Sequence, residues 1–96
     1  MIEVRISEDA DRDLDAILDY GAAHWGIDRA VAYLAIFDDQ FTRLAEFPFL
    51  GTLRPDVGDG VRSLSLGSHI TYFRSERDAV TIARILHRRM APAKHF

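Results

Sequence analysis

The chain has 96 residues, 48% of them hydrophobic and 28% charged, which fits one small globular domain and excludes a disordered or fibrous protein. It contains no cysteine, so disulfides and thiolate metal sites are excluded and a reducing cytoplasm is compatible. The net charge of −3 hides an asymmetry: residues 1–50 hold 4 Arg against 11 Asp and Glu, whereas residues 51–96 hold 8 Lys and Arg against 4 Asp and Glu. Two faces of opposite charge are therefore expected.

The first predicted elements are a strand and a helix. Residues 2–6 alternate apolar and charged side chains, which is typical of a half-buried strand, and the side chains expected to face inward are Ile2, Val4 and Ile6. Ser7 suits the N-cap of the helix, and Gly26 suits its C-terminal end. Small and apolar residues recur at helical spacing between them and predict one buried stripe, made of Ala10, Leu14, Ile17, Leu18, Gly21, Ala22 and Trp25.

A second helix is expected from about Asp28 to Glu46, because Pro48 disfavours helix in the residue before it. The short break between the two helices predicts an antiparallel hairpin. The buried stripe of the second helix is expected to be Ala30, Val31, Leu34, Phe37, Phe41, Leu44 and Ala45. A weaker apolar line either packs under the following loop or binds a partner, and it consists of Tyr33, Ile36 and Phe47.

The second half of the chain predicts a small sheet. Residues 49–60 are rich in turn-forming residues and predict an irregular loop. Apolar runs separated by Gly67-Ser68 and by the polar segment 75–78 then predict three consecutive antiparallel strands, followed by a short tail over residues 90–96. The predicted fold is therefore a single α+β domain over residues 1–96, with an N-terminal strand, an antiparallel helix hairpin and a three-stranded antiparallel sheet in two layers. The sheet face away from the helices is expected to be exposed or to receive a partner.

Residues that could support catalysis cluster near the last strand and the tail. A metal-independent ribonuclease needs a group that activates the 2′-hydroxyl, a cation at the scissile phosphate and a proton donor for the leaving oxygen. Histidine and arginine can fill these roles, and the candidates are His69, Arg84, His87, Arg88, Arg89, Lys94 and His95. Their spacing is not specific for a nuclease, and a structural hydrogen bond at a strand end explains His87 more simply.

Motifs for metals, nucleotides and membranes are missing from the sequence. There is no His-x-x-x-His, no carboxylate–histidine pair at ligand spacing, no GxGxxG and no P-loop, so neither a metal nor a cofactor is expected. No segment approaches the roughly 18 apolar residues that cross a bilayer, and the N-terminus lacks a signal-peptide pattern. We therefore expect a cytoplasmic protein without a membrane partner. The pI of about 5.7 is low for a nucleic-acid binder, which favours arginines that bind a protein partner.

An ordered set of short segments carries a resemblance to a known family. These segments are Tyr20 with Trp25-Gly26, residues 44–48, Leu50-Gly51, residues 53–55, residues 61–63, residues 67–74 and residues 84–90. Together they resemble the ParE toxins of the RelE/ParE superfamily, the toxic halves of bacterial type II toxin–antitoxin modules. The likeness covers nearly the whole chain. No single segment is diagnostic, but the ordered set is specific.

The resemblance implies both a partner and a target. It implies the same fold and a ParD-like antitoxin that wraps the toxin with a helix and an extended segment. Operator DNA would then be contacted only indirectly, through the antitoxin. Toxins of the ParE type are associated with poisoning DNA gyrase, whereas those of the RelE type cleave mRNA in the ribosomal A site. Gyrase is favoured here, because the net negative charge and the ending over residues 86–90 fit the ParE branch better than the more basic nucleases.

Site residues follow from these two alternatives. If the chain were a ribonuclease, the catalytic residues would be Arg84, His87, Arg89 and His95, with His69 where a strand arginine is common. If it binds gyrase, the target-binding residues are expected to be Arg84, Arg88, Arg89, Met90 and Lys94. The antitoxin helix is expected to lie on the apolar surface beside the helix hairpin, and its extended segment near the sheet arginines. The expected antitoxin-binding residues are Tyr33, Ile36, Phe37, Arg62 and Arg74.

Overall fold

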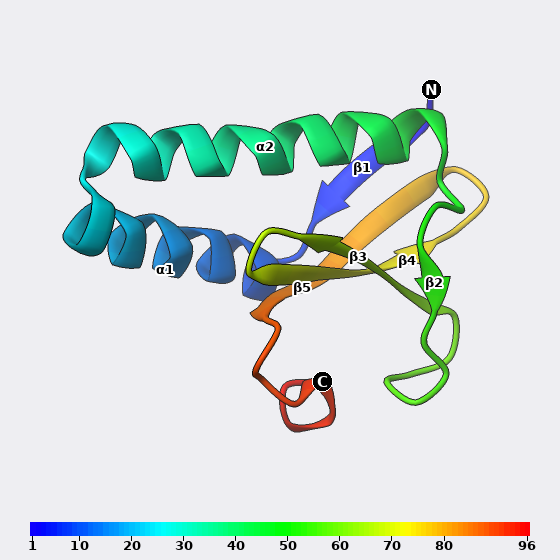
Figure 1. Cartoon of the computed structure of the whole chain (residues 1–96). Coiled ribbons are helices and arrows are strands. Elements are labelled where there is room, and N and C mark those ends of the chain that lie inside the picture. The colour runs from blue at the N-terminus through cyan, green and yellow to red at the C-terminus, as the bar shows by residue number, and fades with distance from the viewer.

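A computed structural model describes residues 1–96 and confirms the predicted α+β class (Figure 1). Its elements are, in chain order, β1 (Glu3–Ile6), α1 (Glu8–Trp25), α2 (Ile27–Glu46), β2 (Thr52–Leu53), β3 (Val61–Leu66), β4 (His69–Ser75), β5 (Ala79–His87) and a 3-10 turn (Pro92–Lys94). The helix hairpin and the turns after β3 and β4 lie where the sequence predicts them.

The sheet has five strands in the order β1-β5-β4-β3-β2, so the prediction of three strands was incomplete. The strand β1 joins the sheet parallel to β5, although the two are far apart in the chain. The strand β2 pairs antiparallel with β3 through Thr52 and Leu53 alone, inside the segment predicted as an irregular loop. Two residues are too few to show an alternating pattern, which explains why the sequence does not reveal β2.

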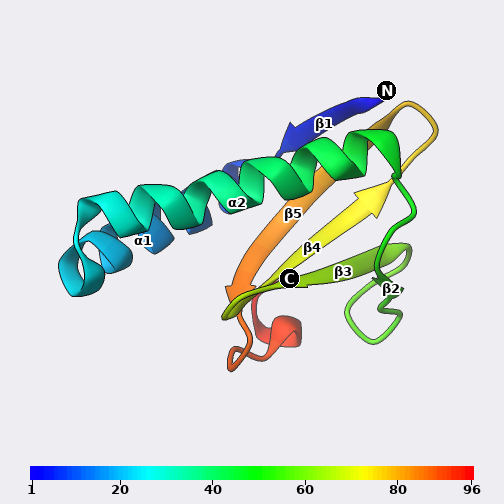
Figure 2. The same ribbon diagram turned by 45° about the horizontal axis from the view of Figure 1, so that its top comes forward.

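The two helices lie across one face of the sheet (Figures 1 and 2). The main core lies between the helices and this face. Its buried side chains are Ala10, Ile17, Phe37, Phe41, Leu44, Phe73, Val80, Ile82 and Ile85. Three residues predicted to be buried are instead exposed: Ile6 by 43%, Trp25 by 40% and Val31 by 54%. The last two lie at the hairpin end that projects beyond the strands, and Ile6 lies where the chain leaves the edge strand.

A β-bulge in β5 decides which side chains of this strand face the helices. Tyr72 pairs with Arg84 but its neighbour Phe73 pairs with Ile82, which leaves Ala83 as the extra residue. The bulge shifts the alternation, so that Ile82 and Ile85 both reach the core. Ser7 fixes this point, because its hydroxyl donates to the Ala83 carbonyl at 2.8 Å while it caps α1 by accepting from the Ala10 amide at 3.0 Å.

The other sheet face is partly covered by the chain itself, rather than open. Val61, Tyr72 and Leu86 form a second, smaller buried cluster there. The Phe96 ring lies edge-on to Tyr72 at 5.5 Å, and the Arg54 guanidinium lies 5.6 Å from the centre of the same ring. The loop before β3 and the C-terminal tail thus shield the face that was expected to receive a partner.

Candidate functional site

The Asp13 carboxylate connects α1 to the second half of β5. The Arg84 Nε donates to its Oδ2 at 2.8 Å and Nη2 donates to its Oδ1 at 2.9 Å, while the Ile85 amide donates to Oδ2 at 2.9 Å. A further Arg84 donor, Nη1, bonds the His95 carbonyl at 2.7 Å and so fastens the tail. The hydrogen bonds to Asp13 raise the pKa of Arg84, and burial opposes them only in part. Three of the five N–H donors of this guanidinium are thus engaged within the fold.

The histidines predicted as catalytic candidates are also engaged in structural bonds. The His87 Nδ1 accepts a hydrogen bond from the Arg89 amide at 3.2 Å, which matches the structural role expected at a strand end. His95 contacts Arg84 through its backbone carbonyl and not through its imidazole. Of the four ribonuclease candidates, Arg84 is held by Asp13, and one ring nitrogen of His87 is held by the Arg89 amide.

The cations predicted to bind a target lie at the end of β5 and in the tail. Arg88 donates to the Gly67 carbonyl at 2.8 Å and remains exposed. Arg89, Met90 and Lys94 are exposed as well. Among the target-binding candidates, only Arg84 is withdrawn from the surface by an ion pair, in which its side chain is 19% exposed.

His69 and Tyr33 form a hydrogen-bond network that sequence reasoning missed. The Tyr33 hydroxyl lies 2.8 Å from the His69 Nδ1, accepts from the Ser68 amide at 3.2 Å and donates to the Leu66 carbonyl at 3.2 Å. Burial lowers the pKa of His69, with the neighbouring His87 adding to this effect and Asp13 opposing it. His69 is therefore a half-buried residue at the start of β4 whose ring is held by α2. Tyr33 precedes it by 36 positions, so no local signal links the two residues.

A shallow apolar groove, here called the α2 groove, runs along α2 and continues to the edge of β3. Two adjoining hollows of about 320 and 360 Å³ share Ile36, which is 49% exposed. One is lined by Trp25, Arg29, Ala32, Tyr33 and Ile36, and the other by Ile36, Asp39, Gln40, Arg43, Leu50, Leu64 and Leu66.

Only some of the residues predicted to contact the antitoxin line this groove. Tyr33 and Ile36 line the groove, but Phe37 is fully buried in the core, so its side chain is not available to a partner. The sequence alone placed Phe37 both in the buried stripe and among the antitoxin contacts. One turn of a helix carries both core-facing and groove-facing positions, so the pattern could not separate the two. Arg62 donates to the Phe49 carbonyl at 3.0 Å, and Arg74 donates to the Asp59 carbonyl at 3.3 Å.

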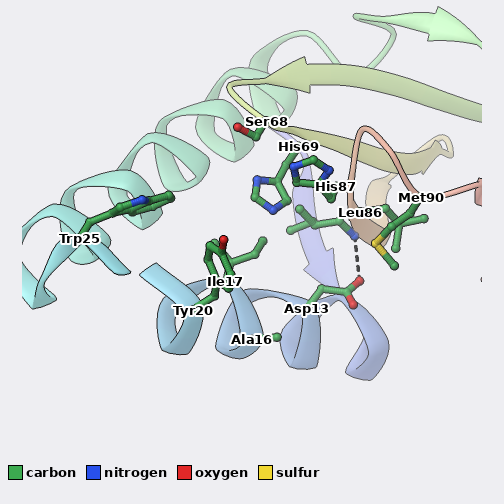
Figure 3. Close-up of a pocket in the computed structure, with 11 residues that line it drawn as sticks. Asp13, Ala16, Ile17, Tyr20, Trp25, Ser68, His69, Leu86, His87 and Met90 are labelled. Atoms are coloured by element: carbon green, nitrogen blue, oxygen red, sulfur yellow. Dashed lines mark hydrogen bonds between the residues drawn. The ribbon is translucent and has the colours of Figure 1, made fainter. Parts of the chain in front are cut away.

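A larger cavity of about 460 Å³ lies between α1 and the end of β5 (Figure 3). It is lined by Asp13, Ala16, Ile17, Tyr20, Trp25, Ser68, His69, Ile85, Leu86, His87 and Met90. Figure 3 shows the His69 and His87 imidazoles side by side, across the hollow from the α1 side chains. Their ring centres are 5.5 Å apart. The structure groups no three His, Cys, Asp or Glu side chains in a way that could hold a metal ion.

Comparison with known sequences identifies the family. A family model described as the ParE toxin of the type II toxin–antitoxin system parDE matches residues 4–92. The Toxin ParE1 of Caulobacter vibrioides is 32% identical over 92 residues, which cover 96% of this chain and 95% of that protein. The chain belongs to the ParE toxin family. The Toxin ParE1 of Mycobacterium tuberculosis is also similar, at 33% identity over 86 residues and 88% of both chains.

Solved structures place this ParE family member in the wider superfamily. A chain of the chromosomal ParDE toxin–antitoxin system from P. aeruginosa aligns with a TM-score of 0.79 and 28% identity, over 91% of this chain and 96% of that one. A chain of the toxin–antitoxin complex RelBE2 from M. tuberculosis aligns with a TM-score of 0.62 and 26% identity, over 91% and 98%. The resemblance to RelE/ParE toxins is thus confirmed. Neither helix is long and apolar enough to cross a membrane.

The first prediction concerns the link between Asp13 and Arg84. Replacing Asp13→Ala leaves a mostly buried guanidinium and the Ile85 amide without their acceptor, so we expect the free energy of unfolding to fall by about 2–4 kcal/mol. Urea denaturation followed by circular dichroism measures the loss. The control is Asp15→Ala, which removes an exposed carboxylate from the same helix. Equal stability of the two variants would contradict the assigned role.

The second prediction concerns the pH dependence of folding. The pKa of His69 is lower in the folded chain than its ordinary value of 6.5, so protonation favours the unfolded state. The stability that His69 contributes is therefore present above about pH 6.5 and is lost as the pH falls through its folded pKa. An NMR titration should give a midpoint below 6.5 for this imidazole.

Denaturation at about pH 7.5 and about pH 5.5 tests the consequence for stability. The loss on acidification should be smaller in His69→Gln, which keeps a hydrogen-bonding side chain but cannot titrate. The matched control is His24→Gln, because His24 is exposed on α1. A loss on acidification that is the same in all three proteins would contradict the prediction.

Proposed function

We propose that this chain inhibits DNA gyrase as a non-enzymatic toxin of the cytoplasm and is neutralised by a ParD-like antitoxin. The observation that most supports inhibition by binding is the engagement of Arg84 by Asp13 at 2.8 and 2.9 Å. Cleavage of RNA without a metal requires a cation, a base and an acid whose side chains are free at one phosphate. Inhibition by binding requires only an exposed surface of the right charge.

The gyrase-binding surface in this proposal is the basic end of β5 with the tail. It consists of Arg88, Arg89, Met90 and Lys94, all of which are exposed. The first turn of α1 carries Glu8, Asp9 and Asp11, and Asp13 of the same helix holds Arg84, so the exposed positive charge at this end belongs to Arg88, Arg89 and Lys94. Charge of this kind guides association and orients the partner.

The antitoxin-binding surface in this proposal is the α2 groove. An amphipathic helix that lies along it would place apolar side chains over Ile36 and the leucines of the groove, with Arg29 and Arg43 available to its carboxylates. β2 pairs only with Arg62 and Ser63, so the β3 edge beyond them has no strand neighbour. An extended segment of the antitoxin can pair there, beside Arg62. Operator DNA would be bound through the antitoxin.

Two assays on the purified, antitoxin-free chain test the target. One follows supercoiling and cleavage complexes of gyrase, and the other follows mRNA cleavage on programmed ribosomes. We expect gyrase inhibition without mRNA cleavage. Arg89→Glu should raise the concentration needed for inhibition about tenfold, since it reverses an exposed charge of the proposed surface. The control is Arg77→Glu, which reverses an exposed charge in the turn after β4.

Two outcomes would contradict the gyrase proposal. Ribosome-dependent mRNA cleavage that is lost in His87→Ala would favour the RelE-type alternative, with His87 and Arg89 at its centre. Inhibition of gyrase that Arg89→Glu and Arg77→Glu weaken equally would remove the basic end of β5 as the binding surface.

A pair of apolar residues on α2 tests the antitoxin surface. Ile36→Glu places a carboxylate in the centre of the α2 groove, so we expect antitoxin affinity to fall at least about 30-fold, as for a central interface residue. The control is Val31→Glu, which carries the same change on the same helix at a site 54% exposed and outside the groove. Calorimetry with the cognate antitoxin measures both affinities. Similar losses in both variants would place the antitoxin elsewhere.

A further inference from the structure

The proposed function assigns no ligand to the cavity between α1 and β5, which shares only Met90 with the proposed gyrase-binding surface (Figure 3). Its volume of about 460 Å³ is within the roughly 300–1,000 Å³ typical of small-molecule sites. The walls are apolar and aromatic, with Ile17, Ile85, Leu86 and Met90 beside Tyr20 and Trp25. The polar groups are few, and the hydrogen bonds around them decide what each can offer a ligand.

When the Tyr33 hydroxyl donates to Leu66, its contact with His69 places the imidazole proton on Nδ1. A tyrosine hydroxyl has one proton to donate and accepts through its lone pairs. The Tyr33 hydroxyl accepts from the Ser68 amide and donates to the Leu66 carbonyl, so its short contact to the His69 Nδ1 is also a hydrogen bond only if that nitrogen carries the proton. In the neutral imidazole the other nitrogen, Nε2, is then an acceptor. The cavity lining includes His69 but not Tyr33. Because Nδ1 contacts Tyr33, Nε2 is the ring nitrogen on the side away from Tyr33.

His87 has the opposite arrangement. Its Nδ1 accepts from the Arg89 amide at 3.2 Å, so in the neutral ring the proton is on Nε2. The cavity is therefore lined by one imidazole with a free acceptor and a second imidazole with a free donor, 5.5 Å apart between ring centres. The lowered pKa of His69 keeps its ring neutral near pH 7.

No unpaired charge of the lining competes with this pair. Asp13 is the one carboxylate of the cavity wall, and both of its oxygens already accept hydrogen bonds from Arg84. A charged ligand would lose its hydration without gaining a counterion. A flat, neutral ring can instead lie between the aromatic and aliphatic walls while it satisfies both imidazoles.

We infer that this cavity binds a small, uncharged heteroaromatic molecule that donates a hydrogen bond to His69 and accepts one from His87. The occupant is a free small molecule and not a segment of the antitoxin, because the antitoxin surface proposed above lies along α2. The inference is independent of the gyrase proposal. It depends on the cavity and its two imidazoles, and its choice of occupant rests on the proposed antitoxin surface.

Benzimidazole is a suitable probe, since its flat bicyclic ring has one N–H donor and one nitrogen acceptor. NMR titration of the purified chain follows the methyl shifts of Ile17 and Ile85, which line the cavity. We expect saturable, one-to-one binding. Indole lacks the acceptor and 1-methylbenzimidazole lacks the donor, so each should bind about tenfold more weakly, as for the loss of one hydrogen bond.

Two variants test the hydrogen bond from His87 and the location of the ligand in the cavity. His87→Phe keeps a ring but removes the donor, so it should weaken benzimidazole about tenfold and leave indole unchanged. Ala16→Phe fills the cavity from an exposed position of α1 and should abolish binding. Its control is Ala23→Phe, which is exposed on the same helix but outside the lining.

Three results would overturn the inference. They are an absence of saturable shifts with benzimidazole, equal affinity for all three probes, and binding that Ala16→Phe leaves intact. Probes that bind without discrimination and are displaced by the antitoxin would assign the cavity to an apolar side chain of the antitoxin instead.

Discussion

The packing of α1, the second half of β5 and the tail against one another depends most on the Asp13 carboxylate. The strand β1 pairs with β5 only as far as Ile82, and beyond that point α1 lies along the strand in its place. Asp13 satisfies the Ile85 amide that a neighbouring strand would otherwise pair, and it holds Arg84 in two hydrogen bonds. Arg84 in turn fastens the tail through the His95 carbonyl. One carboxylate thus joins helix, sheet and tail.

This constraint separates an ion-paired cation of β5 from exposed ones. Among the arginines of the basic half, Arg84 is withdrawn into an ion pair, whereas Arg89 at the end of the same strand remains exposed. The separation supports a toxin that acts through a surface. Trp25 lines both the α2 groove and the cavity beside β5. A partner along α2 and a small molecule in the cavity would therefore share one aromatic wall.

Local patterns in the sequence predicted the elements better than their connections. Alternation, the Ser7 cap and the Gly67 turn are local signals, and they located the helix hairpin and the last three strands. The pairing of β1 with β5, the bond of Ser7 to Ala83 and the bond between Asp13 and Arg84 join residues about 70 or more positions apart, and no periodicity reports such contacts. Residue type alone therefore selected the candidate residues, but it could not show which contacts each of them makes. Phe37 is buried in the core, Arg84 is held in an ion pair, and His69 belongs to a part-buried network.

The central claim is that Arg84 acts through Asp13 as a structural link and does not contact the target. The most direct measurement is gyrase inhibition by the double variant Asp13→Asn with Arg84→Gln, beside its unfolding free energy. The amide of Asn can still accept from Ile85, and removing both charges leaves no unpaired ion in the fold. The account predicts a folded, less stable double variant that inhibits gyrase as the unmodified chain does. A folded double variant that has lost inhibition would contradict it, because Arg84 would then serve the target directly.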